Sequence, residues 1–178
     1  MNPKKIPFAK AKSIFEVDPS FYAAVGVKIV LSDLDNTLDP NKTKTPSEQV
    51  KALKAKLDEA GVLLVIVSNN SPKRVGRYAK ALRVPYACHM LKPFSGRLKK
   101  LLKSLGYRPE EALMVGDQIM TDVLASNRAG VRCLLTDPLV KSEPPWTKWN
   151  RLWERPSRKK MMKKNMIPSW RSFLPEGK

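Results

Sequence analysis

The sequence contains little of several features that would direct its interpretation at once. Only two of its 178 residues are cysteine, Cys88 and Cys133, and neither stands in a CxxC or Cys/His spacing, which excludes a disulfide framework and a zinc site. The longest aliphatic run is VLLVIV at 62–67, far short of the ~18–20 residues that span a bilayer. No apolar segment follows the basic N-terminus, so we expect no secretory signal. We interpret both thiols as buried groups in a reducing compartment.

Acidic residues are also scarce. The chain has 34 Lys and Arg against 16 Asp and Glu, a net charge of +18. The ends carry much of the excess, with +4 in residues 1–12, +6 in 13–140 and +8 in 141–178. This balance predicts attraction to polyanions: nucleic acid, an anionic membrane or a phosphorylated substrate. We divide the chain into a basic N-terminal segment (1–12), one domain (13–140) and a basic, Trp-rich C-terminal tail (141–178).

Apolar runs alternate with helical patterns between residues 27 and 135. The runs are continuous, which is typical of strands buried on both faces; they are VKIVL (27–31), VLLVIV (62–67), ALMV (112–115) and VRCLL (131–135), with a shorter segment around PYACHM (85–90). Between them we expect four helices: one opened by the capping box Thr45–Glu48, one from Ser71-Pro72, one along Leu98–Leu105 and one over Asp122–Ala129. This order predicts an α/β, doubly wound, Rossmann-like parallel sheet of about five strands.

The tail has a different character. Trp146, Trp149 and Trp153 share one face of a predicted short helix, and the basic run RKKMMKKNM follows at 158–166. Tryptophan on one face with cations elsewhere is typical of a membrane-interface segment, although the same side chains could instead pack on the domain as core. We expect the tail to dock only partly and the domain to fold without it.

Polar side chains follow the strands where each one ends. Asp33 and Asp35 come directly after 27–31, Ser68 and Asn69 after 62–67, and Asp117 after 112–115. Lys92 follows PYACHM, and Asp122 lies five residues beyond Asp117. The carboxyl ends of parallel strands meet at one edge of the sheet, where ligands bind in doubly wound folds. The sequence therefore predicts a reaction site at this edge.

The residue types at this edge indicate phosphoryl-transfer chemistry. Asp33, Asp35 and Asp117 would repel one another unless a divalent cation joined them, and hard oxygen ligands favour Mg²⁺. One carboxylate can attack phosphorus in line while a second protonates the leaving oxygen. The Ser68 hydroxyl and the Lys92 ammonium can hold the remaining phosphoryl oxygens.

The motifs DxDxT at 33–37, Ser68, Lys92 and GDxxxTD at 116–122 together closely resemble the haloacid dehalogenase (HAD) superfamily. The resemblance implies that Asp33 is the nucleophile and that Asp35 is the general acid and base. It implies that Mg²⁺ is bound by Asp33, Asp35 (through its backbone carbonyl) and Asp117, with Asp122 close behind. Thr37, Ser68, Asn69 and Lys92 would bind the phosphoryl group. The alternative is a set of Asp-rich loops, with Asp122 only an N-cap. Asp39 has no role in this pattern.

The spacing leaves no room for a cap domain after the first motif or between Ser68 and Lys92, so we expect an open site. KSIFEVDP, VIVSNN, LKP and VGDQIMTDVLASNRAG, within residues 10–155, are similar to the capless phosphatidylglycerophosphate phosphatase-like family. The resemblance implies conversion of phosphatidylglycerophosphate to phosphatidylglycerol. We then expect a cytoplasmic protein peripheral on the membrane, or one on the mitochondrial matrix side in a eukaryote. The alternatives are a HAD phosphatase for a nucleic-acid end or protein phosphate, and a basic nucleic-acid-binding protein on this scaffold.

Overall fold

The computed structural model describes residues 3–140, 156, 158–161 and 163–175. One six-stranded sheet runs in the order β1-β6-β5-β2-β3-β4, and all of its strand pairs are parallel. The strands are β1 (Ala9–Lys10), β2 (Ile29–Ser32), β3 (Leu63–Val67), β4 (Tyr86–Ala87), β5 (Ala112–Gly116) and β6 (Arg132–Leu135). The predicted α/β parallel sheet is confirmed, with one more strand than the sequence suggested.

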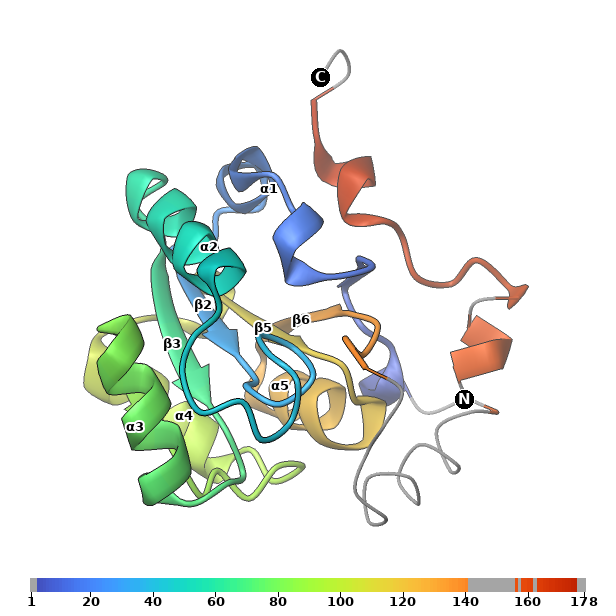
Figure 1. Cartoon of the computed structure of the whole chain (residues 1–178). Helices are drawn as coiled ribbons and strands as arrows, with labels where there is room; N and C mark the ends of the chain where they lie inside the picture. The colour runs from blue at the N-terminus through green and yellow to red at the C-terminus, as the bar shows by residue number, and fades with distance from the viewer. Residues whose placement is uncertain (1–2, 141–155, 157, 162, 176–178) are drawn as a thin grey trace.

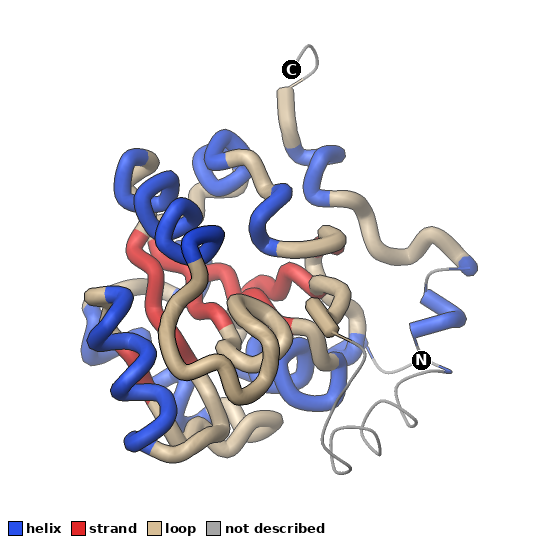
Figure 2. Tube along the Cα trace, viewed as in Figure 1, coloured by secondary structure: helices blue, strands red, loops and turns tan. Residues whose placement is uncertain are grey.

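Helices cover both faces of the sheet (Figures 1 and 2). Side chains of β2 alternate between two apolar clusters, with Val30 in one and Leu31 in the other, because successive strand residues face opposite sides. The first cluster receives side chains from α1 (Pro19–Ala24), α2 (Glu48–Glu59) and α3 (Pro72–Leu82), the second from α4 (Gly96–Leu105) and α5 (Leu124–Ala129). The arrangement is three layers, with the sheet buried in the middle.

Two predicted helix starts differ from the structure. The first helix begins at Glu48 rather than Pro46, because the Ser47 side chain accepts the cap hydrogen bond from the Val50 N–H at 3.4 Å. The predicted helix from Asp122 begins earlier, as a π-helical segment η4 (Ile119–Val123) that leads into α5. Asp122 therefore lies inside a helical segment, and the N-cap interpretation of it is wrong. π-helical turns are frequently found at functional sites.

The structure describes the whole of residues 33–92, and no inserted domain interrupts them. A loop joins β2 to α2, and only α3 and β4 separate β3 from Lys92. The prediction of a chain without a cap at these two positions agrees with the structure. Within the described residues, no helix is long and apolar enough to cross a membrane.

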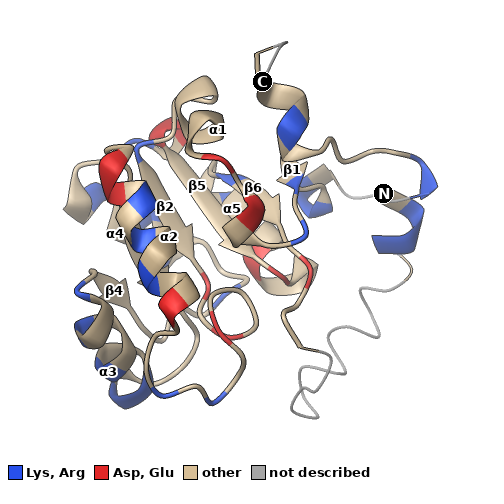
Figure 3. Cartoon of the chain, turned by 45° about the horizontal axis from the view of Figure 1, so that its top comes forward, with Lys and Arg blue, Asp and Glu red and all other residues tan. Residues whose placement is uncertain are grey.

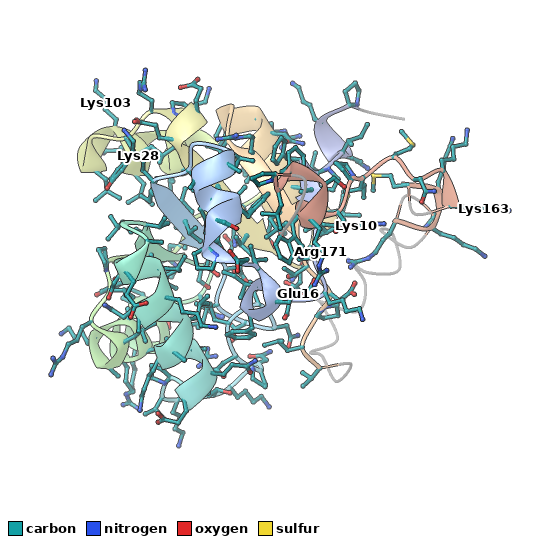
Figure 4. All side chains as sticks on the ribbon, turned by 90° about the horizontal axis from the view of Figure 1, so that it is seen from above. Lys10, Glu16, Lys28, Lys103, Lys163 and Arg171 are labelled. Atoms are coloured by element: carbon teal, nitrogen blue, oxygen red, sulfur yellow. The ribbon has the colours of Figure 1, made fainter. Side chains whose placement is uncertain are left out.

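The packing does not follow the divisions at residues 12 and 140. β1, from the N-terminal segment, pairs with β6, and the Lys10 N–H donates to the carbonyl of Pro168 at 2.9 Å. From the tail, Ile167 is buried in the α4/α5 cluster and Trp170 in the α1/α2/α3 cluster. Figure 4 shows Glu16 near Arg171, to which it pairs at 3.7 Å, whereas Lys163 projects away from the domain. Trp146, Trp149 and Trp153 lie outside the described residues.

Candidate active site

The ends of β2, β3 and β5 place the predicted site residues at one edge of the sheet. Ser32 is in register with Ile66 of β3 and with Val115 of β5, so the residues that follow these strands emerge side by side. The Asp33 N–H donates to the Val115 carbonyl at 2.9 Å, which continues the ladder one residue into the loop. The geometry that the sequence pattern predicts for this edge is present.

Three buried carboxylates meet there. Asp33, Asp117 and Asp122 each offer an oxygen within 4.8 Å of the others. The Lys92 ammonium lies between two of them, donating to Asp33 Oδ1 at 2.6 Å, Asp122 Oδ1 at 2.7 Å and the Val67 carbonyl at 3.2 Å. Asp122 therefore lies in the same cluster and contacts Lys92 directly. When all three carboxylates are ionised, the single ammonium leaves an excess of buried negative charge that suits a divalent cation.

The electrostatics of the cluster follow from its burial. Burial raises the pKa of Asp33 to about 8, and repulsion from Asp122 and Asp117 adds to this effect while Lys92 opposes it. Burial by itself lowers the pKa of Lys92, but Asp122 and Asp33 outweigh it and raise the pKa overall. Lys92 is therefore a fixed positive charge at neutral pH, able to balance charge on a phosphoryl group.

Asp35 points away from the carboxylate cluster. Its Oδ1 pairs with the guanidinium of Arg74 from the first turn of α3, and its Oδ2 accepts from Asn70 Nδ2 at 2.6 Å. Arg74 also donates to the Thr43 carbonyl at 2.7 Å, which fixes the guanidinium between two loops. Arg74 and Asn70 thus hold the Asp35 carboxylate apart from the cluster. This separation is compatible with the role in proton transfer that the resemblance implies for Asp35. Its predicted metal contact, through the backbone carbonyl, does not involve this group.

The predicted phosphate-binding residues have different neighbours. Thr37 Oγ1 donates to Asp117 Oδ1 at 3.3 Å. Ser68 Oγ is buried and accepts from the Asn70 N–H at 3.1 Å. Asn69 uses both ends of its amide on the backbone of Lys92, accepting from its N–H at 2.8 Å and donating to its carbonyl at 3.0 Å. Asn69 therefore positions Lys92, and its contact with phosphate stays a prediction.

Asp39 has a structural role. Its Oδ2 accepts from the Ser47 N–H at 3.0 Å and from the Tyr78 hydroxyl, and its backbone carbonyl accepts from Asn36 N at 2.8 Å. Burial, reinforced by the hydrogen bond to Asp39, raises the pKa of Tyr78. Asp39 thus closes the loop after β2 and ties it to the N-cap of α2 and to Tyr78 in the middle of α3.

Two further residues, Arg158 and Gly116, help to shape the site, and the sequence did not predict their roles. Arg158 donates to the backbone carbonyls of Asp117 (3.3 Å) and Thr136 (3.1 Å) and to Asp137 Oδ1 at 2.5 Å. Nothing in the basic run distinguishes Arg158 from its neighbours. Gly116 faces the Asp122 carboxylate so closely that a Cβ would overlap it. The GD pair that ends β5 was the available signal, since a strand glycine often marks close approach.

We expect Gly116→Ala to lower kcat/KM by about a hundredfold, because a displacement of ~1 Å in a catalytic group can cost that much. The Asp122 carboxylate would have to leave the contact with Lys92 that it makes in the cluster. The measurement is hydrolysis of a soluble aryl phosphate. Gly96→Ala is the matched control, since no atom lies within 4 Å of a Cβ there. Equal activity of both variants would show that the Asp122 position is not critical.

Several known proteins are similar in sequence to this chain. A family profile described as HAD-hydrolase-like matches residues 89–142. The probable phosphatase YqeG of Bacillus subtilis is 32% identical over 154 residues, covering 84% of this chain and 87% of that protein. The chloroplastic phosphatidylglycerophosphate phosphatase 1 of Chlamydomonas reinhardtii is 29% identical over 150 residues, covering 79% of this chain and 56% of that protein.

Solved structures agree on the fold. The cobalt-bound deoxy-D-mannose-octulosonate 8-phosphate phosphatase of Haemophilus influenzae superposes with a TM-score of 0.51 at 18% identity, covering 71% of this chain and 76% of that one. The match to the Bacillus protein extends over most of both chains. This chain belongs to the phosphatase family of the HAD superfamily.

Proposed function

We propose that the protein is a Mg²⁺-dependent phosphomonoester hydrolase that works through an aspartyl-phosphate and converts phosphatidylglycerophosphate to phosphatidylglycerol. The observation that carries the chemistry is the buried cluster of Asp33, Asp117 and Asp122 around Lys92. The support for the lipid is the name of the algal relative, of which this chain spans about half the length.

The residues at the site fit a divalent cation. The cluster offers only hard carboxylate oxygens, which Mg²⁺ prefers. Both carboxylate oxygens of Asp122 already accept hydrogen bonds, Oδ1 from Lys92 and Oδ2 from the Gln118 N–H at 3.2 Å, whereas Lys92 contacts only Oδ1 of Asp33. Asp33 and Asp117 would therefore hold the ion, with the Asp35 carbonyl as the resemblance implies. Bound there, Mg²⁺ would neutralise charge on the phosphoryl oxygens.

The other steps of the proposed reaction are assigned to individual side chains. Lys92 fixes one oxygen of Asp33, and the Asp33 carboxylate attacks phosphorus while the bond to the leaving oxygen breaks. Asp35 gives its proton to that oxygen and then accepts a proton from the water that hydrolyses the aspartyl-phosphate. Arg74 and Asn70 hold Asp35 in position for both steps.

The open surroundings support a large substrate. Residues 33–92 hold no inserted domain that could close over a small metabolite, and enclosure is how active sites exclude water from small substrates. We propose a peripheral position on an anionic membrane surface, on the cytoplasmic face or on the matrix side of a mitochondrion.

A phosphate on a nucleic-acid end or on a protein is the second candidate, favoured by the net charge of +18. The deciding experiment compares kcat/KM on phosphatidylglycerophosphate in mixed micelles with that on a 3′-phosphorylated oligonucleotide at equal salt. We expect kcat/KM for the lipid to be at least about a hundredfold higher, because an enzyme site that contacts the distinctive groups of one substrate discriminates by about this factor against a substrate that lacks them. Faster turnover of the oligonucleotide would overturn the lipid assignment and leave the phosphatase chemistry standing.

Metal removal provides a further expected result. Chelation should abolish activity and Mg²⁺ should restore it, whereas Ca²⁺ should support it poorly because its larger, looser shell misplaces the phosphoryl group. Full activity in excess chelator would contradict a metal-dependent mechanism.

The pH dependence of stability follows from Asp33. Without metal, its pKa is about 8 in the folded chain against 3.8 in an unperturbed aspartate. The folded chain then binds a proton that the unfolded chain has lost, so the free energy of unfolding falls as the pH rises through this window. Mg²⁺ displaces that proton, and the rise in Tm on adding Mg²⁺ should grow between about pH 6 and pH 8. Thermal unfolding with and without Mg²⁺ measures this, and a pH-independent rise would contradict it.

A further inference from the structure

Two large apolar side chains stand exposed on the loop that carries Lys92. Among the described residues, the large hydrophobic side chains with substantial exposure are Leu91 (54%), Phe94 (70%), Tyr86 (38%) and Met166 (36%). The two most exposed of them lie within four residues of each other, in the loop between β4 and α4. Lys92, between them, points inward and is buried in the site.

Specific contacts fix the outward direction of this pair. Met90 is buried, and its N–H donates to the Ser68 carbonyl at 3.1 Å, while the Asn69 amide binds both backbone groups of Lys92. Phe94 N–H donates to the Leu91 carbonyl at 2.9 Å, which closes a turn.

The backbone at Leu91 makes its side chain unexpected. Its φ is +54°, in the left-handed region that leucine seldom adopts. Glycine or asparagine would take this conformation at lower cost and would suit solvent better. Folding of the loop therefore does not account for leucine at this position, and an exposed apolar side chain of this kind is typical of an interaction surface.

The charge around the loop identifies that partner. Residues 60–109, from the end of α2 through α3, the loop and α4, hold eleven Lys and Arg and no Asp or Glu. Figure 3 shows basic but no acidic residues on α3. Arg97 donates to the His89 carbonyl and Arg128 to the Pro93 carbonyl at 3.0 Å, so both guanidinium groups lie on the loop itself. Apolar side chains surrounded by cations are the pattern of an anionic lipid interface.

We propose that Leu91 and Phe94 insert into the headgroup region of an anionic bilayer while the surrounding cations contact lipid phosphates. This inference rests on the proposed lipid substrate. Because Lys92 is adjacent to both side chains, insertion would turn the carboxyl edge of the sheet toward the membrane, and a phosphomonoester headgroup could reach Asp33 without leaving the bilayer. A single-stranded nucleic acid also binds aromatic and basic groups, but the aliphatic Leu91 offers no ring for stacking, which favours lipid.

The test measures binding of the full chain to vesicles of phosphatidylglycerol and phosphatidylcholine. Phe94→Ser should lower the partition constant about tenfold, since an apolar contact is lost, whereas Phe94→Trp should retain binding. Met166→Ser is the matched comparison, an exposed apolar side chain of the basic run at 158–166 and away from the loop, and it should weaken binding much less than Phe94→Ser. Wild-type binding by Phe94→Ser, or loss of binding only in Met166→Ser, would overturn the proposal.

A second measurement keeps an aromatic side chain at position 94 and follows its surroundings directly. The extra indole of Phe94→Trp, read as the difference from the parent protein, should shift its emission to shorter wavelength on anionic vesicles. An unchanged spectrum would overturn insertion. Loss of single-stranded oligonucleotide binding in Phe94→Ser, with vesicle binding intact, would assign the loop to nucleic acid instead.

Enzyme kinetics distinguish a failure of the loop-insertion proposal from a failure of the proposed lipid substrate. Phe94→Ser should reduce kcat/KM about tenfold on phosphatidylglycerophosphate in vesicles and leave hydrolysis of a soluble aryl phosphate unchanged. If the parent protein bound vesicles through Phe94 and hydrolysed the aryl phosphate but not the lipid, the substrate assignment would fail and the loop would stand. If the lipid were hydrolysed equally well by the parent and Phe94→Ser, the loop proposal would fail alone.

Discussion

Asp33→Asn is expected to lower phosphatase kcat by about three decades or more while the protein stays folded. The amide has nearly the shape of the carboxylate but cannot serve as the nucleophile. Lys92 keeps its ion pair with Asp122 at 2.7 Å, so the buried ammonium does not lose all of its partners. Initial rates on a soluble aryl phosphate at saturating Mg²⁺ provide the measurement.

The same variant has an expected effect on stability. Burial disfavours the charged form of Asp33, whose pKa is raised to about 8, so the neutral amide should not destabilise the metal-free protein at alkaline pH. Asp58→Asn is the matched control, since this carboxylate lies on the exposed part of α2 and pairs only with Lys54 in the described structure. More than about a tenth of parental kcat in folded Asp33→Asn would remove the assigned nucleophile.

Trp170→Ala is expected to destabilise the fold by about 3–5 kcal/mol, the usual cost of removing a buried Trp or Phe. The indole is buried and packs edge-on against Phe21, with ring centroids 6.2 Å apart, and its N–H donates to Glu16 at 3.2 Å. Because domains are stable by only about 5–15 kcal/mol, this loss would consume much of the total. Urea unfolding measures it.

Phe94→Ala is the control for that experiment, an aromatic side chain that is 70% exposed and should change stability by less than about 0.5 kcal/mol.

The packing of Trp170 also changes the expectation for a chain cut after Val140. Such a chain would lose Met161 and Ile167 from one face of the sheet and Trp170 from the other, so we expect it to fail to fold. A cooperative unfolding transition in the truncated chain would restore the division at residue 140.

Local patterns were sufficient for most of the central fold. The run at 62–67 became β3 because a continuous apolar segment of that length is satisfied only when both faces are covered. Gly106 and Gly130 end α4 and α5 with positive φ, as their position after an apolar stripe predicts. These features depend on neighbours within a few residues, so a single sequence carries them.

The features that the local sequence did not predict have a common physical origin. β1 is two residues long and exists because its backbone pairs with β6, more than a hundred residues away, and nothing in the local sequence at 9–10 encodes that partner. The motif places Asn69 beside the site, but it does not reveal that the Asn69 amide binds the backbone of Lys92. A side chain that can donate and accept takes whichever partner the fold brings near.

The sequence by itself determined the order of the central strands and helices, the edge of the sheet at which the candidate site residues gather and the types of those residues. These follow from hydrophobic period, helix signals and the topology of parallel sheets. Only the tertiary structure decided that Asp122 joins Asp33 and Asp117 around Lys92, that Asp35 is held apart by Arg74, and that the C-terminal segment completes the core. Those outcomes depend on side-chain direction and on contacts between distant segments, which form only when the whole chain packs.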